Sequence, residues 1–263
     1  MVKQTKIEPF FAIQIIGKRD EQEDSYGICY NFESLNRSFP SCFVLADGMG
    51  GHSGGDVASQ TAIDSVKLVV ESCDVYDGRT LRDSLSAANL NIAECLNVNA
   101  DLEGMGTTLV VLIIAGENAF WVSVGDSPLL SLNYNHELHL LNEDHSMRPV
   151  LDELVASGVL KEDSPDYKTK VSQLRSALTG DNIKLYDLND EGFSLAESKY
   201  LVLSSDGLDT LSREEVKSVM VANVKKGPKE IASQLINAIE KKGSTKQDNT
   251  TLIVIDPLAY QTS

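Results

Sequence analysis

Acidic side chains in this sequence recur at the ends of short apolar runs, where strands are expected to end. Asp47 follows FVLA, Asp126 follows FWVSVG and Asp206 follows YLVLSS. Asp248 stands directly before TTLIVI, and the acids of EQED precede another such run. A single Asp-Gly or Asp-Asn pair is an ordinary turn signal. If strand ends bring several of these acids into one partly desolvated cleft, however, their repulsion is severe unless cations offset it.

A glycine-rich loop follows the first of these acids in LADGMGGHSGG, residues 45–55. A dinucleotide-binding G-x-G-x-x-G counted from Gly48 would need glycine where Ser53 stands, and a P-loop from Gly50 would need lysine where Asp56 stands. The loop is therefore no nucleotide cradle, and its glycines let the backbone pass close to a site at Asp47. Oxygen ligands without a convincing set of histidines and cysteines select Mg²⁺ or Mn²⁺ over zinc.

Composition excludes several classes of partner. The chain has 263 residues, with 39 Asp and Glu against 23 Lys and Arg, and its net charge of -16 would repel nucleic acid and anionic membranes. The longest apolar run, residues 109–115, is far shorter than the roughly 20 residues that cross a bilayer, and no signal peptide precedes it. Cys29, Cys42, Cys73 and Cys95 form no C-x-x-C pair, which favours reduced thiols. We therefore expect a soluble cytoplasmic protein with neither nucleic acid nor membrane as a partner.

The elements that must position the acids follow from hydrophobic periodicity. Runs rich in Val, Ile, Phe and Trp predict strands at 10–16, 26–30, 42–46, 107–115, 119–124, 129–132, 138–141, 199–204 and 250–255. Apolar spacing of three and four residues predicts consecutive helices at 56–70 and 80–96. A second pair is expected at 212–221, opened by a Ser212/Glu215 capping box, and at 228–242. Strands that alternate with helix pairs indicate an α+β fold of largely antiparallel sheets with helices outside.

One domain is the simplest partition of residues 1–263, with a core of about 8–257, because no repeat, low-complexity tract or linker interrupts the chain. The segment SGVLKEDSPDYKTK, Ser157 to Lys170, stands apart because it is polar, weakly periodic and too long for an ordinary turn. We expect it to form a mobile surface flap.

Several segments match, in chain order, the motifs of one enzyme family. They are GKRDEQEDSYGI (17–28), LADGMGGHSGGDVAS (45–59), GMGTTLVVLII (104–114), VSVGDSPLLSL (122–132), NEDHS (142–146), LRSALTG (174–180), LVLSSDGL (201–208) and QDNTTLIVI (247–255). With these motifs the chain resembles the metal-dependent Ser/Thr protein phosphatases of the PPM, or PP2C, family in its compact bacterial form. The resemblance implies a sandwich of two mainly antiparallel sheets flanked by pairs of antiparallel helices, in α-β-β-α layers. It also implies hydrolysis of phosphoserine and phosphothreonine in proteins.

The resemblance assigns metal ligands to four positions. Asp47 matches an aspartate that bridges two metal ions, and the carbonyl of Gly48 would ligate one of them. Asp206 and Asp248 match ligands of the second ion. Two cations about 3.5–4 Å apart can polarise a bridging water and hold the attacking and leaving oxygens of an in-line displacement at phosphorus. The implied cofactor is therefore a pair of Mn²⁺ or Mg²⁺ ions.

Three residues near the start of the chain complete the implied site. Glu23 and Asp24 match acids near the first ion that act largely through bound water. Arg19, four residues ahead of Glu23, matches the arginine that grips the substrate phosphate. A planar guanidinium binds two phosphate oxygens at once, which lysine cannot copy.

The chain departs from the family at a further metal site. That site uses the acid of GDS, which is Asp126 here, and an aspartate four positions after the one in SDG. The second position is Thr210, and the nearest acid, Asp209, stands one residue early. A third ion held by Asp126 and Asp209 is therefore an open alternative to a site of two ions.

The acid that would protonate the leaving group is a second departure. Animal members of the family place a histidine directly after DG, where this chain has Met49. His52 in the same loop is a catalytic candidate, and an exposed loop histidine without a role is the alternative. A metal-bound water, or no acid at all, leaves the position equally served.

Two other functions compete with an active metal enzyme. Cys73 and Arg79 fit C-x5-R, the signature of cysteine-dependent phosphatases, but Asp74 and Asp77 would repel a phosphate and no strand precedes the cysteine. A pseudophosphatase that binds phosphoproteins without hydrolysing them is the other alternative, although the ligand acids and Arg19 are all present. The expected partners are phosphoproteins, the substrates of a cytoplasmic Ser/Thr kinase, and the expected state is a monomer.

Overall fold

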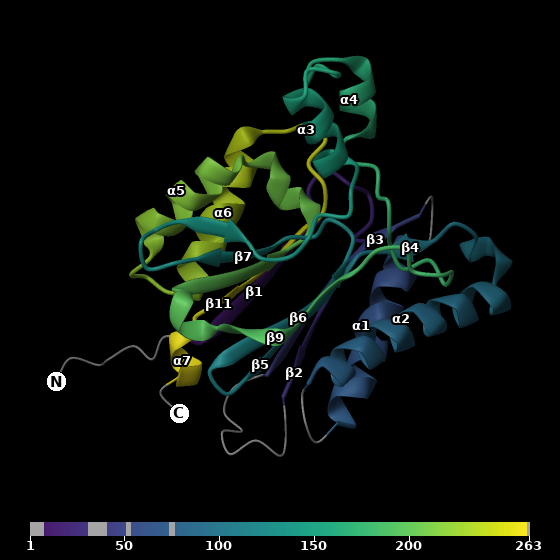
Figure 1. Ribbon diagram of the computed structural model, residues 1–263, viewed down its shortest axis with the longest axis horizontal. Helices are drawn as coiled ribbons and strands as arrows, with labels where there is room; N and C mark the ends of the chain where they lie inside the picture. The colour runs from purple at the N-terminus through teal and green to yellow at the C-terminus, as the bar shows by residue number, and fades with distance from the viewer. Residues whose placement is uncertain (1–7, 31–40, 51–53, 74–76, 262–263) are drawn as a thin grey trace.

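The computed structural model describes residues 8–30, 41–50, 54–73 and 77–261, which form two antiparallel sheets (Figure 1). The five-stranded sheet has the order β1 (Phe10–Ile15), β11 (Thr250–Ile255), β10 (Tyr200–Ser204), β7 (Leu129–Leu132) and β8 (Leu138–Leu140). The six-stranded sheet has the order β2 (Asp24–Cys29), β3 (Cys42–Met49), β5 (Leu109–Ala115), β6 (Asn118–Val124) and β9 (Asp187–Ser194). Its remaining strand, β4 (Gly106–Thr107), pairs with β3. The outer strands β1 and β2 are joined by the turn that carries the predicted phosphate-binding arginine.

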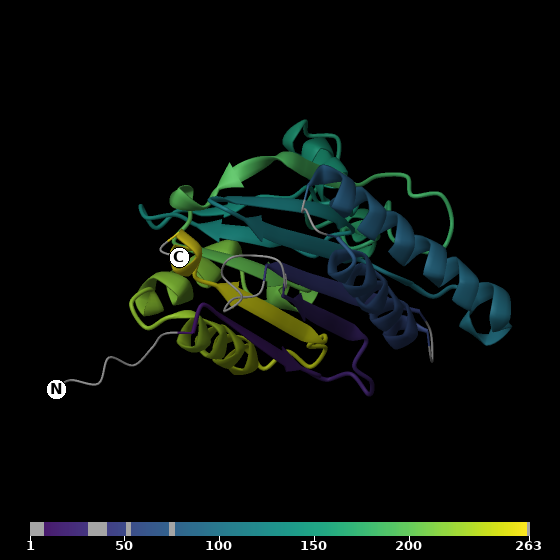
Figure 2. The ribbon, with the colours of Figure 1, turned by 90° about the horizontal axis from the view of Figure 1, so that it is seen from below.

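Pairs of helices cover the outer faces of the two sheets (Figure 2). The helices α1 (Gly55–Glu71) and α2 (Gly78–Val98) pack on the six-stranded sheet. The helices α5 (Arg213–Asn223) and α6 (Pro228–Lys242) pack on the five-stranded sheet. This arrangement confirms the predicted α+β sandwich. None of the helices in the described residues is both long and apolar enough to cross a bilayer.

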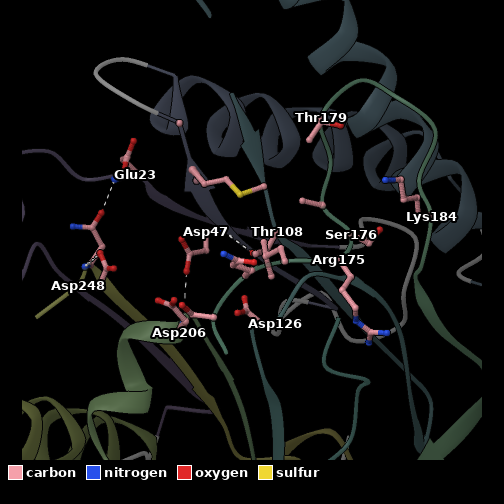
Figure 3. A pocket seen from close by; sticks show the side chains of 18 of the residues that line it. Glu23, Asp47, Thr108, Asp126, Arg175, Ser176, Thr179, Lys184, Asp206 and Asp248 are labelled. Atoms are coloured by element: carbon pink, nitrogen blue, oxygen red, sulfur yellow. Dashed lines mark hydrogen bonds between the residues drawn. The ribbon is translucent and has the colours of Figure 1, made fainter. Parts of the chain in front are cut away.

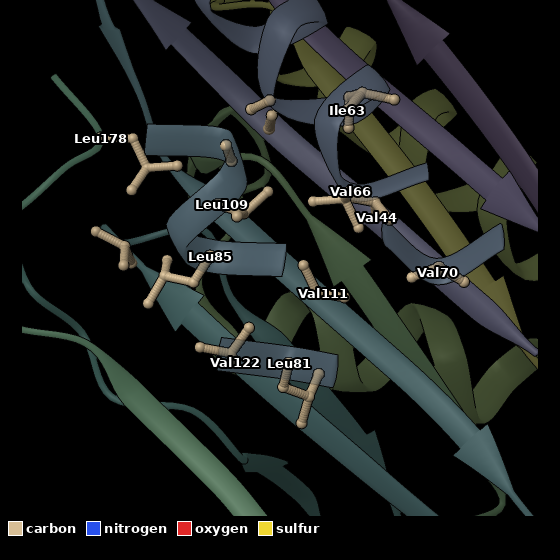
Figure 4. Packing of buried hydrophobic residues seen from close by; sticks show 14 of the residues in the cluster. Val44, Ile63, Val66, Val70, Leu81, Leu85, Leu109, Val111, Val122 and Leu178 are labelled. Atoms are coloured by element: carbon tan, nitrogen blue, oxygen red, sulfur yellow. The ribbon is translucent and has the colours of Figure 1, made fainter. Parts of the chain in front are cut away.

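The alternation of side chains along β3 shows how a continuous apolar run serves two cores. Val44 and Ala46 point to the cluster under α1 and α2, where Figure 4 shows Val44 beside Ile63 and Val66. Phe43 and Leu45 point instead into the cluster between the two sheets. Because successive residues of a strand face opposite sides, a strand buried on both faces needs apolar residues at every position. β3 is therefore a rigid central support for the acid near its end.

Helix ends follow the local signals in the sequence. The predicted capping box of α5 is present, since the Ser212 hydroxyl accepts from the Glu215 N–H and the Glu215 carboxylate accepts from the Ser212 N–H. Asp77 caps α2 in the same way by accepting from the N–H groups of Arg79 and Thr80. Such caps satisfy the donors left free in the first turn of a helix.

Two features of the fold differ from the sequence prediction. No strand was predicted at β9, because DLNDEGFS is acidic and weakly apolar, yet it forms the sheet edge beside β6. The segment 157–170 was expected to be irregular, but its second half is the helix α4 (Pro165–Lys170), capped by Ser164. The buried ring of Tyr167 anchors α4 by donating from its hydroxyl to Asp152 on α3 (Arg148–Ala156). The short helix α7 (Leu258–Gln261) ends the described chain.

Candidate active site

A cavity of about 650 Å³ lies at the end of the sandwich where the predicted acids meet (Figure 3). Both sheets contribute to it, since Asp47 belongs to β3 of one sheet while Asp206 follows β10 and Asp248 precedes β11 of the other. The predicted residues that line it are Arg19, Glu23, Asp47, Gly48, Asp126, Asp206 and Asp248. Strand ends that are far apart in sequence thus bring the acids together.

The register of β2 and β3 places two of the acids directly opposite each other. Asp24 pairs with Asp47, so Asp47 lies inside β3 and not after its end, as the sequence had indicated. Asp24 is buried and lies behind the cavity lining, where its Oδ2 accepts from the hydroxyls of Ser205 and Thr251 at 2.7 Å each. Asp24 thereby joins the two sheets beneath the site. Its other oxygen, Oδ1, is buried and has no hydrogen-bond partner.

Glycines are required where the backbone crowds the acids. A Cβ at Gly48 would lie 2.1 Å from the carbonyl oxygen of Gly55 and 2.5 Å from that of Glu23. A Cβ at Gly55 would lie 2.3 Å from Oε1 of Glu23. Real Cβ atoms do not approach other atoms this closely, so only glycine permits the start of α1 to pack against the loop before β2. The close backbone approach that the sequence suggested is therefore present.

Crowding of like charges raises the pKa of the acids in the cavity. Burial is the largest cause for Asp47, followed by the charges of Asp206 and Asp24, and the pKa of Asp47 lies well above its ordinary range. Burial together with the charges of Asp126 and Asp248 raises the pKa of Asp206 to about 7. A carboxylate far from water and beside other carboxylates holds its proton more tightly. These acids are therefore destabilised as anions unless a positive charge compensates them.

The donor set fits a hard divalent cation. Several carboxylates face one cavity, and the partnerless Oδ1 of Asp24 lies directly behind them. Oxygen-only donors suit Mg²⁺ or Mn²⁺. Within the described residues, no three acidic, histidine or cysteine side chains already converge as a closed ligand set. Asp248 is instead engaged by Arg19, so the acids would have to turn toward a shared ion.

Arg19 lies at the rim of the cavity in a turn that is held to β11. Its guanidinium donates to Oδ2 of Asp248 at 2.5 Å, and its side chain is 55% exposed. Asn249 fixes the turn, because its side chain donates to the carbonyls of Ile16 and Glu21 and accepts from the N–H of Glu23. The sequence analysis used only the aspartate of QDN and missed this role of the asparagine, although the motif itself was the available signal.

The structure does not bring Asp209 into the main cavity. Its carboxylate pairs with Arg148 at 3.5 Å and with Arg213 at 3.7 Å. It lines an adjoining cavity of about 300 Å³, which Asp126 also borders. The hydroxyl of Thr210 donates to Oε1 of Gln247 at 2.7 Å. Asp126 thus lies between the two cavities.

The loop that carries Asp126 is fixed by neighbouring polar groups. The N–H of Gly125 donates to Nδ1 of the buried His145, and the hydroxyls of Thr108 and Ser127 share a hydrogen bond of 2.8 Å. The pKa of Asp126 is raised to about 6, chiefly by burial and then by the charge of Asp144. Like the acids beside it, Asp126 would gain from a nearby cation.

Two catalytic alternatives from the sequence can be placed as follows. His52 lies outside the described residues. Cys73 follows helix α1 and no strand, and Arg79 lies in the first turn of α2 with 86% of its side chain exposed. Neither of these two residues lines the acidic cavity. The C-x5-R match therefore has no phosphate-binding geometry around it.

A family model described as protein phosphatase 2C matches residues 22–247 of the chain. The chain belongs to the protein phosphatase 2C family. It is 32% identical over 249 residues to a protein named serine/threonine phosphatase stp from Listeria monocytogenes, an alignment that covers 90% of this chain and 91% of the relative. The membership confirms the family expected from the motifs, and with it a protein phosphatase.

Solved structures of phosphatases share the fold. The crystal structure of serine/threonine phosphatase Stp1 from Staphylococcus aureus superposes with a TM-score of 0.79 at 28% identity, over 96% of this chain and 95% of that one. The catalytic domain of the phosphatase PstP, in complex with two manganese ions, superposes with a TM-score of 0.72 at 28% identity. That alignment covers 94% of this chain and 96% of PstP.

Proposed function

We propose that this protein phosphatase 2C hydrolyses phosphoserine and phosphothreonine in phosphoproteins and depends on divalent cations to do so. The observation that carries the proposal is the acidic cavity, in which burial and mutual repulsion hold the carboxylates ready for positive charge. The relative PstP, crystallised with two manganese ions, supports a site of two Mn²⁺ or Mg²⁺ ions.

The residues that would hold the ions are Asp47, Gly48, Asp206 and Asp248, with Asp24 and Glu23 behind them. When bound, the ions would supply the Lewis acidity that lowers the pKa of water and compensates charge on the phosphoryl oxygens. The chain itself supplies geometry. Thr108 fixes Asp47 by donating from its N–H to the Asp47 carbonyl and accepting the Asp47 N–H with its hydroxyl. Asp24 locks β2 to the opposite sheet through Ser205 and Thr251.

Arg19 would bind the phosphate of the substrate. Its guanidinium lies at the rim, more than half exposed, and its turn is fixed by Asn249, so it can reach an anion in the cavity without losing the support of its backbone. Its present partner, Asp248, is one of the proposed ligands. A dianionic phosphate and a cation would therefore each replace one half of the pair between Arg19 and Asp248, which keeps both charges compensated.

A third ion is a finer proposal that rests on Asp126. Asp126 borders both cavities and has a raised pKa, whereas Asp209 is paired with two arginines. Replacing Asp126 by alanine should reduce the number of Mn²⁺ ions bound at saturation, as counted by equilibrium dialysis. Unchanged stoichiometry together with unchanged activity would remove the third ion from the account.

We also propose that the protein is a cytoplasmic monomer that acts on the substrates of a Ser/Thr kinase. The net charge of -16 opposes self-association. Free thiols support a reducing compartment, since Cys29 and Cys42 lie opposite each other on β2 and β3 without forming a disulfide.

The test is phosphate release from a phosphothreonine peptide in Mn²⁺ or Mg²⁺, with Asp206→Asn and Arg19→Ala measured alongside. The unaltered protein should release phosphate, and Asp206→Asn should abolish release. Arg19→Ala should raise KM for the peptide, because it removes a ligand of the phosphate. A protein that binds the peptide but releases no phosphate at any metal concentration would instead be the pseudophosphatase.

A further inference from the structure

The side of the catalytic cavity opposite Glu23 and Asp248 is formed by residues 172–184, here called the far wall (Figure 3). It carries two cations, Arg175 and Lys184, which both line the cavity. Its single acid is Asp181. The far wall is therefore a positively charged surface facing an acidic site, in a chain with a net charge of -16.

Arg175 differs from the other arginines of the described chain. Each of those others lies within 4.0 Å of an aspartate carboxylate, namely Arg19, Arg79, Arg82, Arg148 and Arg213. Arg175 has no such partner in the part of the chain that the structure describes. It is half-buried, and it donates from Nε to the carbonyl of Ser146 at 2.7 Å and from one terminal nitrogen to that of Asp144 at 3.3 Å. Carbonyl partners orient the guanidinium but leave its charge uncompensated.

Hydrogen bonds hold Arg175 and Lys184 in fixed relation to each other. The hydroxyl of Ser176, the neighbour of Arg175, donates to the carbonyl of Leu185 at 2.8 Å and accepts the Leu185 N–H at 3.0 Å. Leu185 directly follows Lys184, so the two cations lie on backbones that are joined at this point. Lys184 is exposed and also has no ion pair within the described residues.

Contacts to the rest of the protein make the far wall rigid. Leu178 exchanges backbone hydrogen bonds with Thr107 on β4, at 3.0 and 2.9 Å. The side chain of Asn89 on α2 accepts from the N–H of Gly180 and donates to the carbonyl of Asp181. A binding surface that is already ordered loses little conformational entropy when a ligand arrives. The two cations are thus presented to the cavity in advance.

We propose that Arg175 and Lys184 bind a second anionic group of the substrate, close in sequence to the phosphorylated residue. This inference rests on the proposed function, since it supplies the substrate class of that same site. The preferred substrates are phosphoproteins with an acidic side chain, or a second phosphate, within a few residues of the phosphoserine or phosphothreonine. An anion from the substrate compensates the half-buried guanidinium of Arg175, and Lys184 adds a second, more exposed charge.

The test compares kcat/KM for a set of phosphothreonine peptides that differ only in flanking residues. One peptide carries glutamine on both sides, one carries glutamate, and one carries a phosphonate analogue of phosphoserine that cannot be hydrolysed. The unaltered protein should prefer the acidic peptides by about fivefold, since each partly exposed ion pair contributes a factor of about two to five. Comparing glutamate with phosphonate shows which anion the wall receives. High salt should shrink the preference.

Charge reversal on the wall makes the test decisive. Lys184→Glu should lower the ratio of acidic to neutral kcat/KM by about tenfold. Lys225→Glu, at the exposed end of α5, makes the same change in net charge and should leave the ratio unaltered. Arg175→Lys should keep part of the preference that Arg175→Met loses. If Arg175→Met fails to fold, Lys184→Glu still decides the question.

The outcomes separate this inference from the proposed function. Phosphate release from all peptides with one ratio for the unaltered protein and Lys184→Glu would overturn the inference alone. No release from any peptide would overturn the proposed function itself.

Discussion

Replacing Asp206 by asparagine should stabilise the protein stripped of metal at alkaline pH, although it should abolish catalysis. Burial and the charges of Asp126 and Asp248 raise the pKa of Asp206 to about 7 in the folded state, against roughly 3.9 in an unfolded chain. The folded protein therefore holds this proton more tightly than the unfolded chain does. Its contribution to stability is fully present below about pH 4 and is lost as the pH rises through about 7.

The size of the effect follows from the difference in pKa. About three pKa units at 1.36 kcal/mol each correspond to about 4 kcal/mol. Since neighbouring acids share the strain, we expect asparagine to recover about 2–4 kcal/mol near pH 8 and about 1 kcal/mol near pH 5. Saturating Mn²⁺ should reverse the order, because an ion present at 100 times its Kd stabilises the unaltered protein by about 2.7 kcal/mol.

The assay is urea denaturation in EDTA at both pH values, with Asp209→Asn as the matched control. Asp209 lies three residues away, is 40% exposed and pairs with Arg148 and Arg213, so its replacement should cost about 0–1 kcal/mol at either pH. If Asp206→Asn leaves the free energy of unfolding near pH 8 unchanged or lowers it, the repulsion inferred for the cavity is refuted.

Three further substitutions probe the supports of the site. Gly48→Ala should lose both thermal stability and phosphate release, because its Cβ would lie 2.1 Å from the Gly55 carbonyl oxygen; a stable, fully active variant would disprove that close approach. Asn249→Ala removes three hydrogen bonds that hold the turn of Arg19 and should raise KM for a phosphopeptide more than it changes kcat, whereas an unaltered KM would speak against the positioning role. Leu45→Ala, between the sheets, should cost about 2–5 kcal/mol in urea denaturation, and a cost below about 1 kcal/mol would show that the inter-sheet core relaxes around the cavity.

The sequence predicted the elements that are buried on both faces or amphipathic, because their apolar patterns reflect packing directly. β3, β11 and the helix pairs are of this kind. β9 gave no such signal, since a sheet edge stabilised by pairing with β6 tolerates the acidic run DLNDEGFS. The helix α4 was missed for a similar reason, because six polar residues capped by Ser164 have little apolar periodicity. Tertiary contacts, above all that of Tyr167, order this segment.

The acids of the site could be located from sequence because each stands next to an apolar run. What could not be predicted is how they relate in space. Asp24 lies behind the cavity as a bridge between sheets, and Asp209 turns toward two arginines that are distant in sequence or on the next helix. The far wall was equally hidden, because the LRSALTG motif says nothing of which cations lack a carboxylate partner. Such relations depend on the packing of many elements and leave no local pattern.

The most direct test of the central claim is phosphate release from a phosphothreonine peptide before and after chelation. The account predicts release in Mn²⁺, loss of release in EDTA, full recovery when Mn²⁺ is restored, and no effect of alkylating the four thiols. Release that persists in EDTA and disappears on alkylation would contradict the account and point instead to chemistry at Cys73.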